Sequence, residues 1–177
     1  MTSPRDPVVL IGPMGAGKTS IGRRVAKRLG VGFYDSDQAV VQEHGPIEEL
    51  FANRGEPYFR ALERAAVRAG LETGGVVALG GGAVMDAGTR ADLARHRVVL
   101  LTVSPAVVAA RLRDTTRPLL QTEDAMRSWR QIMERRRPLY EEVADITFDT
   151  SSGPLSTVVD GIVRWARSTA AGREQET

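Results

Sequence analysis

A glycine-rich segment carrying one lysine and one threonine is the strongest chemical signal in the sequence. Residues 12–19, Gly-Pro-Met-Gly-Ala-Gly-Lys-Thr, match the G-x-x-x-x-G-K-[ST] pattern of phosphate-binding loops. Glycines let backbone N–H groups curl around phosphate oxygens without Cβ clashes. The lysine can reach the β- and γ-phosphates, and the threonine hydroxyl can ligate Mg²⁺. The residues expected to hold the nucleotide phosphates are Gly15, Ala16, Gly17, Lys18, Thr19 and Ser20.

Two acidic residues follow a short apolar run. Phe33-Tyr34 predicts a strand that ends in Asp35-Ser36-Asp37. Residues i and i+2 of an extended segment project to the same side, so both carboxylates are expected at the carboxyl end of a strand, where open α/β sheets bind ligands. One acid could support Mg²⁺, and the other could accept a proton from an acceptor hydroxyl. The alternative is a helix N-cap followed by a surface acid.

The metal-supporting acid has a preferred position. Loop ATPases often carry an aspartate at the end of a later strand. Here the apolar run 76–79 leads instead into Gly80-Gly81-Gly82, which indicates a close approach of the backbone to a ligand or to another element. Asp35 is therefore the best candidate for supporting the metal.

Several arginines are candidates for binding anions. Arg60 could bind an anionic acceptor group or could form an ion pair with a neighbouring glutamate. Arg117 lies in a polar segment, residues 113–122, whose length is typical of a lid. Lids in phosphoryl transfer bring an arginine onto the γ-phosphate, although an ordinary exposed connection is the alternative. In Arg135-Arg136-Arg137, the charges could favour a helix end, or one of them could face the acceptor pocket.

The elements that position these residues alternate between strand and helix, which predicts a parallel sheet with helices on both faces. Apolar runs predict strands at 8–11, 33–34, 76–79, 98–103 and 146–148; periodicity predicts helices at 19–29, 37–44, around 47–51, 58–71, 86–95, 105–112, 123–137 and 155–165. Gly30 is expected to end the first helix and Pro138 the long one, and Ala87-Gly88 is expected to form a turn.

Composition excludes several classes of protein. The 177 residues suit one domain, and the absence of cysteine excludes disulfides and a thiol nucleophile and fits a reducing cytoplasm. The apolar runs are shorter than the ~20 residues of a membrane span. A net charge of +2 is too small for a nucleic-acid footprint. We expect a cytoplasmic monomer that binds neither nucleic acid nor membrane, with a frayed polar end from residue 168.

Six segments in this order resemble the shikimate kinase family over nearly the whole chain. They are residues 12–19, Asp35-Ser36-Asp37, Phe59-Arg60, Leu79-Gly80-Gly81-Gly82-Ala83, Arg117-Pro118-Leu119-Leu120 and Arg136-Arg137-Pro138-Leu139-Tyr140. The resemblance implies a P-loop three-layer α/β/α fold of the nucleoside-monophosphate-kinase type with a five-stranded parallel sheet. It implies one kinase domain over residues 1–170, an acceptor-binding region near 36–62 and a lid near 113–124. The polar residues 171–177 are expected to form a disordered tail.

The resemblance also implies a reaction and a set of roles. The reaction is MgATP-dependent phosphorylation of the 3-hydroxyl of shikimate in aromatic amino-acid synthesis. At the nucleotide end, the resemblance implies that Lys18 contacts the phosphates, Thr19 ligates Mg²⁺ and Asp35 supports the metal ion through water. At the acceptor end, it implies that Asp37 holds the acceptor hydroxyls as base or orienting group, that Arg60 and Arg136 bind the carboxylate, and that Gly81 and Gly82 pack on the acceptor. Arg117 is implied to close on the transferring phosphate. Adenine contacts are implied for Pro154 and one of two arginines, Arg111 rather than Arg113.

Two alternatives remain. One is another small-molecule kinase of the same fold, acting on gluconate or a nucleoside monophosphate. A nucleotide acceptor would call for more lid arginines than Arg117 alone. The other is a nucleotide-binding module that has lost catalysis, and the presence of Lys18, Thr19, Asp37 and Arg117 argues against it.

Overall fold

The structure is a computed structural model that describes residues 6–113 and 123–174. Five parallel strands form one sheet in the order β2-β3-β1-β4-β5. The strands are β1 (Val8–Ile11), β2 (Phe33–Asp35), β3 (Val76–Ala78), β4 (Arg97–Thr102) and β5 (Ile146–Asp149). The helices are α1 (Lys18–Leu29), α2 (Ser36–His44), α3 (Ile47–Arg54), α4 (Glu56–Thr73), the 3₁₀ turn η1 (Ala83–Met85), α5 (Ala87–Leu93), α6 (Pro105–Arg113), α7 (Glu123–Val143) and α8 (Leu155–Glu174).

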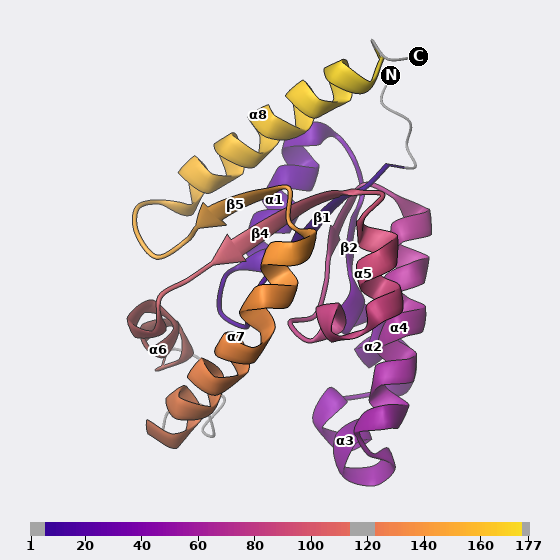
Figure 1. Cartoon of the computed structure of the whole chain (residues 1–177), viewed down its shortest axis with the longest axis vertical. Helices are drawn as coiled ribbons and strands as arrows, with labels where there is room; N and C mark the ends of the chain where they lie inside the picture. Colours follow the sequence, from indigo (N-terminus) through magenta and orange to yellow (C-terminus); the bar gives the residue numbers. More distant parts are fainter. Residues whose placement is uncertain (1–5, 114–122, 175–177) are drawn as a thin grey trace.

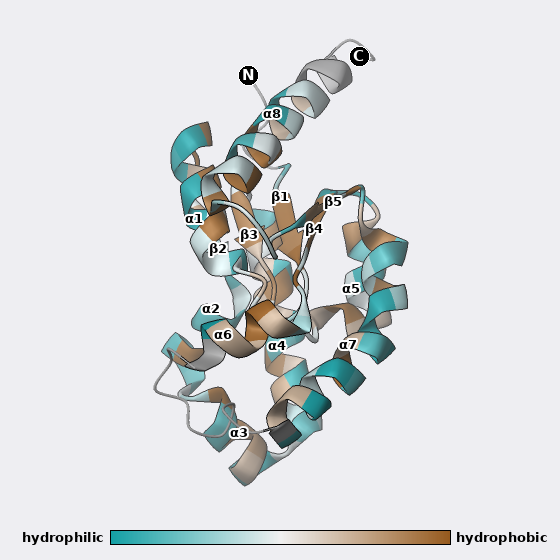
Figure 2. Cartoon of the chain, turned by 90° about the vertical axis from the view of Figure 1, so that its left-hand side faces the viewer, coloured by the Kyte–Doolittle hydropathy of each residue, from teal (hydrophilic) through white to brown (hydrophobic). Residues whose placement is uncertain are grey.

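The helices lie on both faces of the sheet, as the alternating pattern predicts. Helices α1 and α8 pack side by side on one face, and α5 and α7 lie on the other (Figures 1 and 2). Helices α2, α3 and α4 extend beyond the sheet. The expected three-layer α/β/α architecture with a five-stranded parallel sheet is confirmed.

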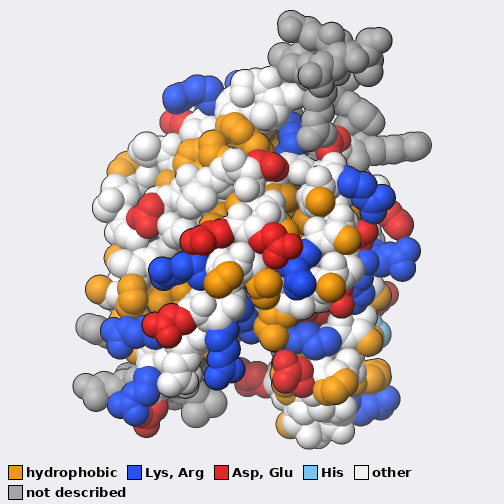
Figure 3. Space-filling model, viewed as in Figure 1, with side chains coloured by type: hydrophobic (Ala, Val, Ile, Leu, Met, Phe, Trp, Pro, Cys, Tyr) orange, Lys and Arg blue, Asp and Glu red, His pale blue; other side chains and the backbone are white. Residues whose placement is uncertain are grey.

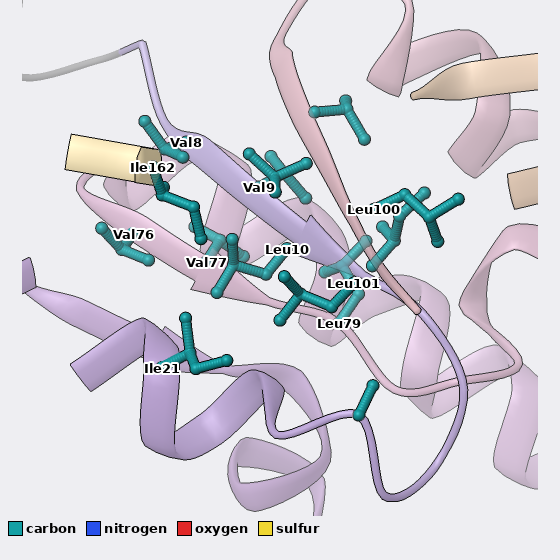
Figure 4. Close-up of a cluster of buried hydrophobic side chains, with 14 of the residues drawn as sticks. Val8, Val9, Leu10, Ile21, Val76, Val77, Leu79, Leu100, Leu101 and Ile162 are labelled. Atoms are coloured by element: carbon teal, nitrogen blue, oxygen red, sulfur yellow. The ribbon is translucent and has the colours of Figure 1, made fainter. Parts of the chain in front are cut away.

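The central strands are covered on both faces, so they are apolar along their whole length instead of alternating. Every residue of β1 and β3 is buried. Figure 4 shows Leu10 of β1 and Val77 of β3 close to Ile21 of α1 and Ile162 of α8. Since all strands run the same way, their carboxyl ends meet at one edge of the sheet, and this edge carries the candidate site.

A second, smaller core holds α2, α3 and α4 together. It consists of Val40, Leu50 and Phe59, one residue from each helix. The rings of Phe59 and Phe51 add a tilted contact, with centroids 4.8 Å apart. This cluster joins α2, α3 and the first turns of α4 into a packing unit beside the main sheet, while Val67 and Leu71 further along α4 belong to the main core.

The long helix α7 differs most from the sequence-based expectation. It was predicted to end at Pro138, yet it continues to Val143 with the proline inside it. A proline in a helix interior lacks the N–H donor and costs about 3 kcal/mol. Beyond it, Leu139 and Val143 pack against the main core and Tyr140 is completely buried. This packing offsets the local cost, which periodicity and propensity alone do not reveal.

Two further boundaries are corrected. Asp86 caps α5 by accepting a hydrogen bond from the backbone N–H of Thr89 at 2.7 Å, so Ala87-Gly88 form the first helical turn and not a separate turn. Helix α8 runs to Glu174, so the fraying expected from residue 168 and the disorder expected from 171 are wrong as far as Glu174. Residues 175–177 lie outside the described part. Within the described ranges, no helix has the length and apolar character of a membrane span.

Candidate active site

Two loops and the end of a third strand meet at the carboxyl edge of the sheet. Residues 12–17 follow β1, Asp35 ends β2, and residues 80–82 follow β3, the strand between them in the sheet. Figure 3 shows the molecule hollowed at its lower edge between α7 and the unit of α3 and α4, with Lys and Arg side chains on both sides of the hollow. The predicted phosphate loop and the predicted acceptor residues therefore share one region.

The loop after β1 has the backbone shape that phosphate binding requires. Gly15 and Gly17 have φ angles of 87° and 91°, a region that side-chain-bearing residues rarely adopt. Lys18 folds back over the loop, and its Nζ donates to the carbonyls of Gly12 at 2.7 Å and Pro13 at 3.1 Å. The ammonium is thus held in place before any phosphate arrives.

Side chains from distant elements hold the next three carbonyls of the same loop. Trp129 Nε1 donates to Met14 O at 2.9 Å, Arg111 Nη1 to Gly15 O at 2.6 Å, and Thr150 Oγ1 to Ala16 O at 2.9 Å. Arg111, expected near adenine, also donates through Nη2 to Thr150 O at 2.6 Å. Sequence reasoning missed Trp129 and Thr150, because a donor to a backbone carbonyl leaves no local sequence pattern.

Thr19 and Asp35 are neighbours in space. The Thr19 hydroxyl donates to Asp35 Oδ2 at 2.7 Å, while Asp35 Oδ1 accepts from the backbone N–H of Gln38 at 3.1 Å. Asp35 is therefore both the N-cap of α2 and a partner of the predicted metal ligand. The N-cap interpretation is confirmed for Asp35, and the support of a metal ion by this residue stays a prediction.

The geometry expected for Asp37 is corrected. Helix α2 begins at Ser36, so Asp35 and Asp37 do not share an extended segment, and Asp37 lies in the first helical turn. Ser36 is completely buried and its Oγ accepts the backbone N–H of Gly80 at 3.0 Å. This bond ties the start of α2 to the glycine loop, where a Cβ on Gly80 would collide with the Asp37 carboxylate.

Loss of hydration, with a smaller contribution from the charge of Arg136, lowers the pKa of Lys18 to about 8. The carboxylates of Asp37 and Asp35 oppose that shift, which places both acids within electrostatic reach of the ammonium. The site therefore brings together the lysine and the two acids that the sequence nominates, although the two acids reach it from different elements.

We expect nucleotide affinity to depend on pH through Lys18. In the free protein, the ammonium loses its proton as the pH rises through about 8, and a bound phosphate favours the charged form. Consequently kcat/KM for ATP, which reports the free enzyme, should fall above pH ~8, whereas kcat should hold to higher pH. Steady-state kinetics from about pH 6.5 to about pH 10 measures both constants. A kcat/KM that does not change with pH would contradict the role given to Lys18.

Arg60 forms the ion pair that was one of the two interpretations proposed for it, while its binding of an acceptor stays a prediction. Its Nη1 contacts the buried carboxylate of Glu63 at 2.7 Å, and its Nε lies 3.4 Å from Glu56. Burial raises the pKa of Glu63, and the hydrogen bond and charge of Arg60 oppose that rise. The guanidinium also packs so closely on Gly82 that a Cβ there would collide with it. The ion pair thus fixes Arg60 beside the glycine loop.

Arg136 is the member of the arginine run that faces the site. It is half-buried, whereas Arg135 and Arg137 are exposed. A Cβ on Gly81 would lie 3.4 Å from Arg136 Nη1. Tyr140, one helical turn further, donates its hydroxyl to Gly81 O at 2.5 Å and also pairs with Arg136. Tyr140 is a third residue of this site, after Trp129 and Thr150, to which the sequence analysis gave no role.

The other residues that the sequence predicts for the site differ in where the structure places them. Arg117 lies outside the described residues, as does most of the lid expected near 113–124, whose ends belong to α6 and α7. Ser20 is exposed in the first turn of α1, and Pro154 is exposed just before α8. In residues 6–113 and 123–174, no three His, Cys, Asp or Glu side chains gather into a potential metal site.

Comparisons with known proteins agree with one another. A family model described as shikimate kinase matches residues 14–167. A shikimate kinase of Streptomyces avermitilis is 51% identical over 81% of this chain and 84% of the relative, and one of Saccharopolyspora erythraea is 46% identical over 94% and 97%. The solved structure of the Acinetobacter baumannii shikimate kinase in complex with shikimate has a TM-score of 0.83 at 37% identity, covering 93% of this chain and 94% of that one. A gluconokinase from Sinorhizobium meliloti, with a TM-score of 0.68 at 19% identity, shares the fold.

Proposed function

The chain belongs to the shikimate kinase family, and from this premise we propose how its site works. The chain is an ATP-dependent kinase that phosphorylates the 3-hydroxyl of shikimate, giving shikimate 3-phosphate and ADP on the route to the aromatic amino acids. One observation carries the assignment at the site. The phosphate loop with Lys18 lies next to a glycine loop that Arg60 and Arg136 flank, with Asp37 between the two.

We propose that Gly15, Ala16, Gly17, Lys18, Thr19 and Ser20 hold the phosphates, with Lys18 neutralising charge as the phosphoryl group moves. The contact between Thr19 and Asp35 fits Mg²⁺, since this ion prefers oxygen ligands and keeps part of its water shell. Bound there, Mg²⁺ would neutralise negative charge on the phosphate oxygens. We assign the hydroxyl of Thr19 as ligand and Asp35 as the acid that supports it through water.

At the acceptor end, Arg60 and Arg136 are proposed to bind the shikimate carboxylate, because guanidinium groups match carboxylates with paired hydrogen bonds. Gly81 and Gly82 provide a surface without side chains against which the ring packs. Asp37 holds the acceptor hydroxyls. Arg117 is proposed to contact the transferring phosphate, and Arg111 and Pro154 are proposed to border the adenine.

We also propose a regional organisation and a setting. Residues 36–62 form the acceptor-binding region, consistent with the separate core of α2, α3 and α4. Residues 113–124 are proposed as the lid. The protein is proposed to be a cytoplasmic monomer that binds no nucleic acid, which size-exclusion chromatography with light scattering and a gel-shift assay would test.

The reaction is tested by ADP release from MgATP with and without shikimate, with gluconate and AMP as control acceptors. We expect release that depends on shikimate and stops when EDTA removes the metal. Release with gluconate or AMP instead would keep the phosphate site and overturn the acceptor assignments. Binding of ATP without release for any acceptor would point to a non-catalytic module.

Gly82→Ala is expected to raise KM for shikimate about tenfold and to leave KM for ATP nearly unchanged. Gly82 has ordinary backbone angles, so the added Cβ acts by displacing the Arg60 guanidinium and not by straining the chain. Loss of one charge-assisted hydrogen bond is worth about 1.5–3 kcal/mol, and partial displacement costs less. Gly32→Ala, where a Cβ meets nothing within 4 Å, is the matched control. Equal KM values in Gly82→Ala and the control would remove Arg60 from acceptor binding.

A further inference from the structure

Helix α7 presents one face to both substrate loops. Trp129, Met133, Arg136 and Tyr140 follow one another at intervals of four, three and four residues, which places them on a single face of a helix. Trp129, Met133 and Tyr140 are buried. Trp129 donates to the phosphate loop and Tyr140 to the glycine loop. At about 1.5 Å per residue, the Cα atoms of Trp129 and Tyr140 lie roughly 16 Å apart along the helix axis. The two side chains converge on loops that touch each other, since a Cβ on Gly81 would lie 3.7 Å from the backbone nitrogen of Met14.

The hydrogen bond from Trp129 sets the direction of a phosphate-loop donor. The carbonyl of Met14 belongs to the same planar peptide unit as the N–H of Gly15, and in a trans peptide the two point in opposite directions. The indole holds that carbonyl at 2.9 Å, so the Gly15 N–H is fixed toward the other side of the chain. Trp129 is buried, and a buried indole N–H needs an acceptor, which the carbonyl of Met14 provides.

The hydrogen bond from Tyr140 has the same effect on the acceptor side. The carbonyl of Gly81 shares its peptide unit with the N–H of Gly82, the residue against which Arg60 packs. Tyr140 also pairs with Arg136. One buried hydroxyl therefore orients the glycine loop and one of the two arginines proposed for the carboxylate.

We propose that α7 aligns the two substrates, with Trp129 and Tyr140 as positioning residues for the nucleotide and the acceptor respectively. The inference rests on the proposed function, which gives the two loops their ligands. A helix is a stiff element, so two loops attached to one face of it keep a fixed separation. In-line phosphoryl transfer depends on the separation and direction of the donor and acceptor oxygens.

Trp129→Phe and Tyr140→Phe test the proposal, since each keeps an aromatic ring and removes one donor. Trp129→Phe should weaken the binding of MgADP about threefold to tenfold, the worth of one hydrogen bond, and leave the Kd of shikimate unchanged. Tyr140→Phe should do the reverse. A residue that merely stabilises the fold would lower the melting temperature and the active fraction without this crossed pattern in the two Kd values, measured by calorimetry.

The chain offers matched controls. Tyr34→Phe removes another tyrosine bond to a carbonyl, from Tyr34 Oη to Ala66 O at 2.8 Å, in the strand beside the site. Trp165→Phe replaces the other tryptophan of the sequence, on α8. Both should leave the two Kd values within about twofold, a shift smaller than one hydrogen bond. If Trp129→Phe and Tyr140→Phe weaken both ligands equally, or weaken neither, the alignment by α7 is wrong.

A second measurement avoids substituting the positioning residues. In Trp165→Phe, Trp129 is the remaining tryptophan, and MgADP should change its emission whereas shikimate alone should not. An emission unmoved by saturating MgADP would overturn the role of Trp129. The proposed function is tested independently, by measuring ADP release in the wild-type protein. Failure of shikimate-dependent ADP release there would overturn the function, while an active wild type with unaltered variants would overturn only the alignment.

Discussion

Lys18→Met is expected to lower kcat/KM for ATP about 10³-fold, the loss typical of removing a preorganised donor at a developing charge. Methionine keeps most of the length of the side chain but has neither charge nor donor. The carbonyls of Gly12 and Pro13 hold the ammonium in place before a phosphate binds, and the carboxylates of Asp35 and Asp37 favour its charged form. Among the described residues, no other side chain donates to these two carbonyls. Stopped-flow and steady-state kinetics with shikimate give the rate.

The control for this change is built into the sequence, because Lys27 is its other lysine and lies exposed near the end of α1. Lys27→Met should keep wild-type rates. The melting temperature of Lys18→Met should not fall, since the lowered pKa of about 8 means that the buried charge costs stability at neutral pH, and methionine removes that charge. If Lys18→Met retains about a tenth or more of the wild-type kcat/KM, this lysine is not the main phosphate contact.

Asp37→Asn is expected to lower kcat by about 10²- to 10⁴-fold, the range of general acid–base contributions, while leaving MgATP binding within about twofold. Asparagine keeps the shape of the side chain but accepts a proton poorly. The first turn of α2 holds the carboxylate beside Gly80, in the glycine loop that follows β3, and β3 is the direct neighbour of β1, the strand that precedes the phosphate loop. A loose transition state needs little early proton abstraction, so a loss near the lower value would favour orientation of the hydroxyl over base catalysis.

Glu43→Gln provides the comparison, since it removes one negative charge from the exposed end of the same helix. Its kcat should match the wild type. Calorimetry with MgADP establishes that the nucleotide site of Asp37→Asn is intact. Normal turnover in Asp37→Asn would remove this residue from the mechanism, whatever the position of its side chain.

The sequence located most elements because its local signals and the tertiary fold agree. Val8–Ile11 is an apolar run that the sheet buries completely, and Gly30 ends α1 in the left-handed conformation that favours glycine. The failures occur where a distant contact overrides a local preference. Pro138 is the clearest case, because buried Tyr140 and its bond to Gly81 stabilise a helix that the proline locally disfavours. Asp86 is a milder one, since its capping bond turns an expected turn into the start of α5.

For the site, the sequence by itself determined the chemistry. The spacing of the glycines, Lys18 and Thr19 specifies a phosphate loop, because the covalent chain already brings those groups together. Only the tertiary structure decided which distant groups hold them. Three outcomes depend on the packing of elements far apart in the chain. The guanidinium of Arg60 packs on Gly82, one of three consecutive arginines turns inward, and Trp129 holds the carbonyl of Met14. Such contacts arise between residues whose spacing along the chain carries no fixed period, so they appear only once the helices have packed on the sheet.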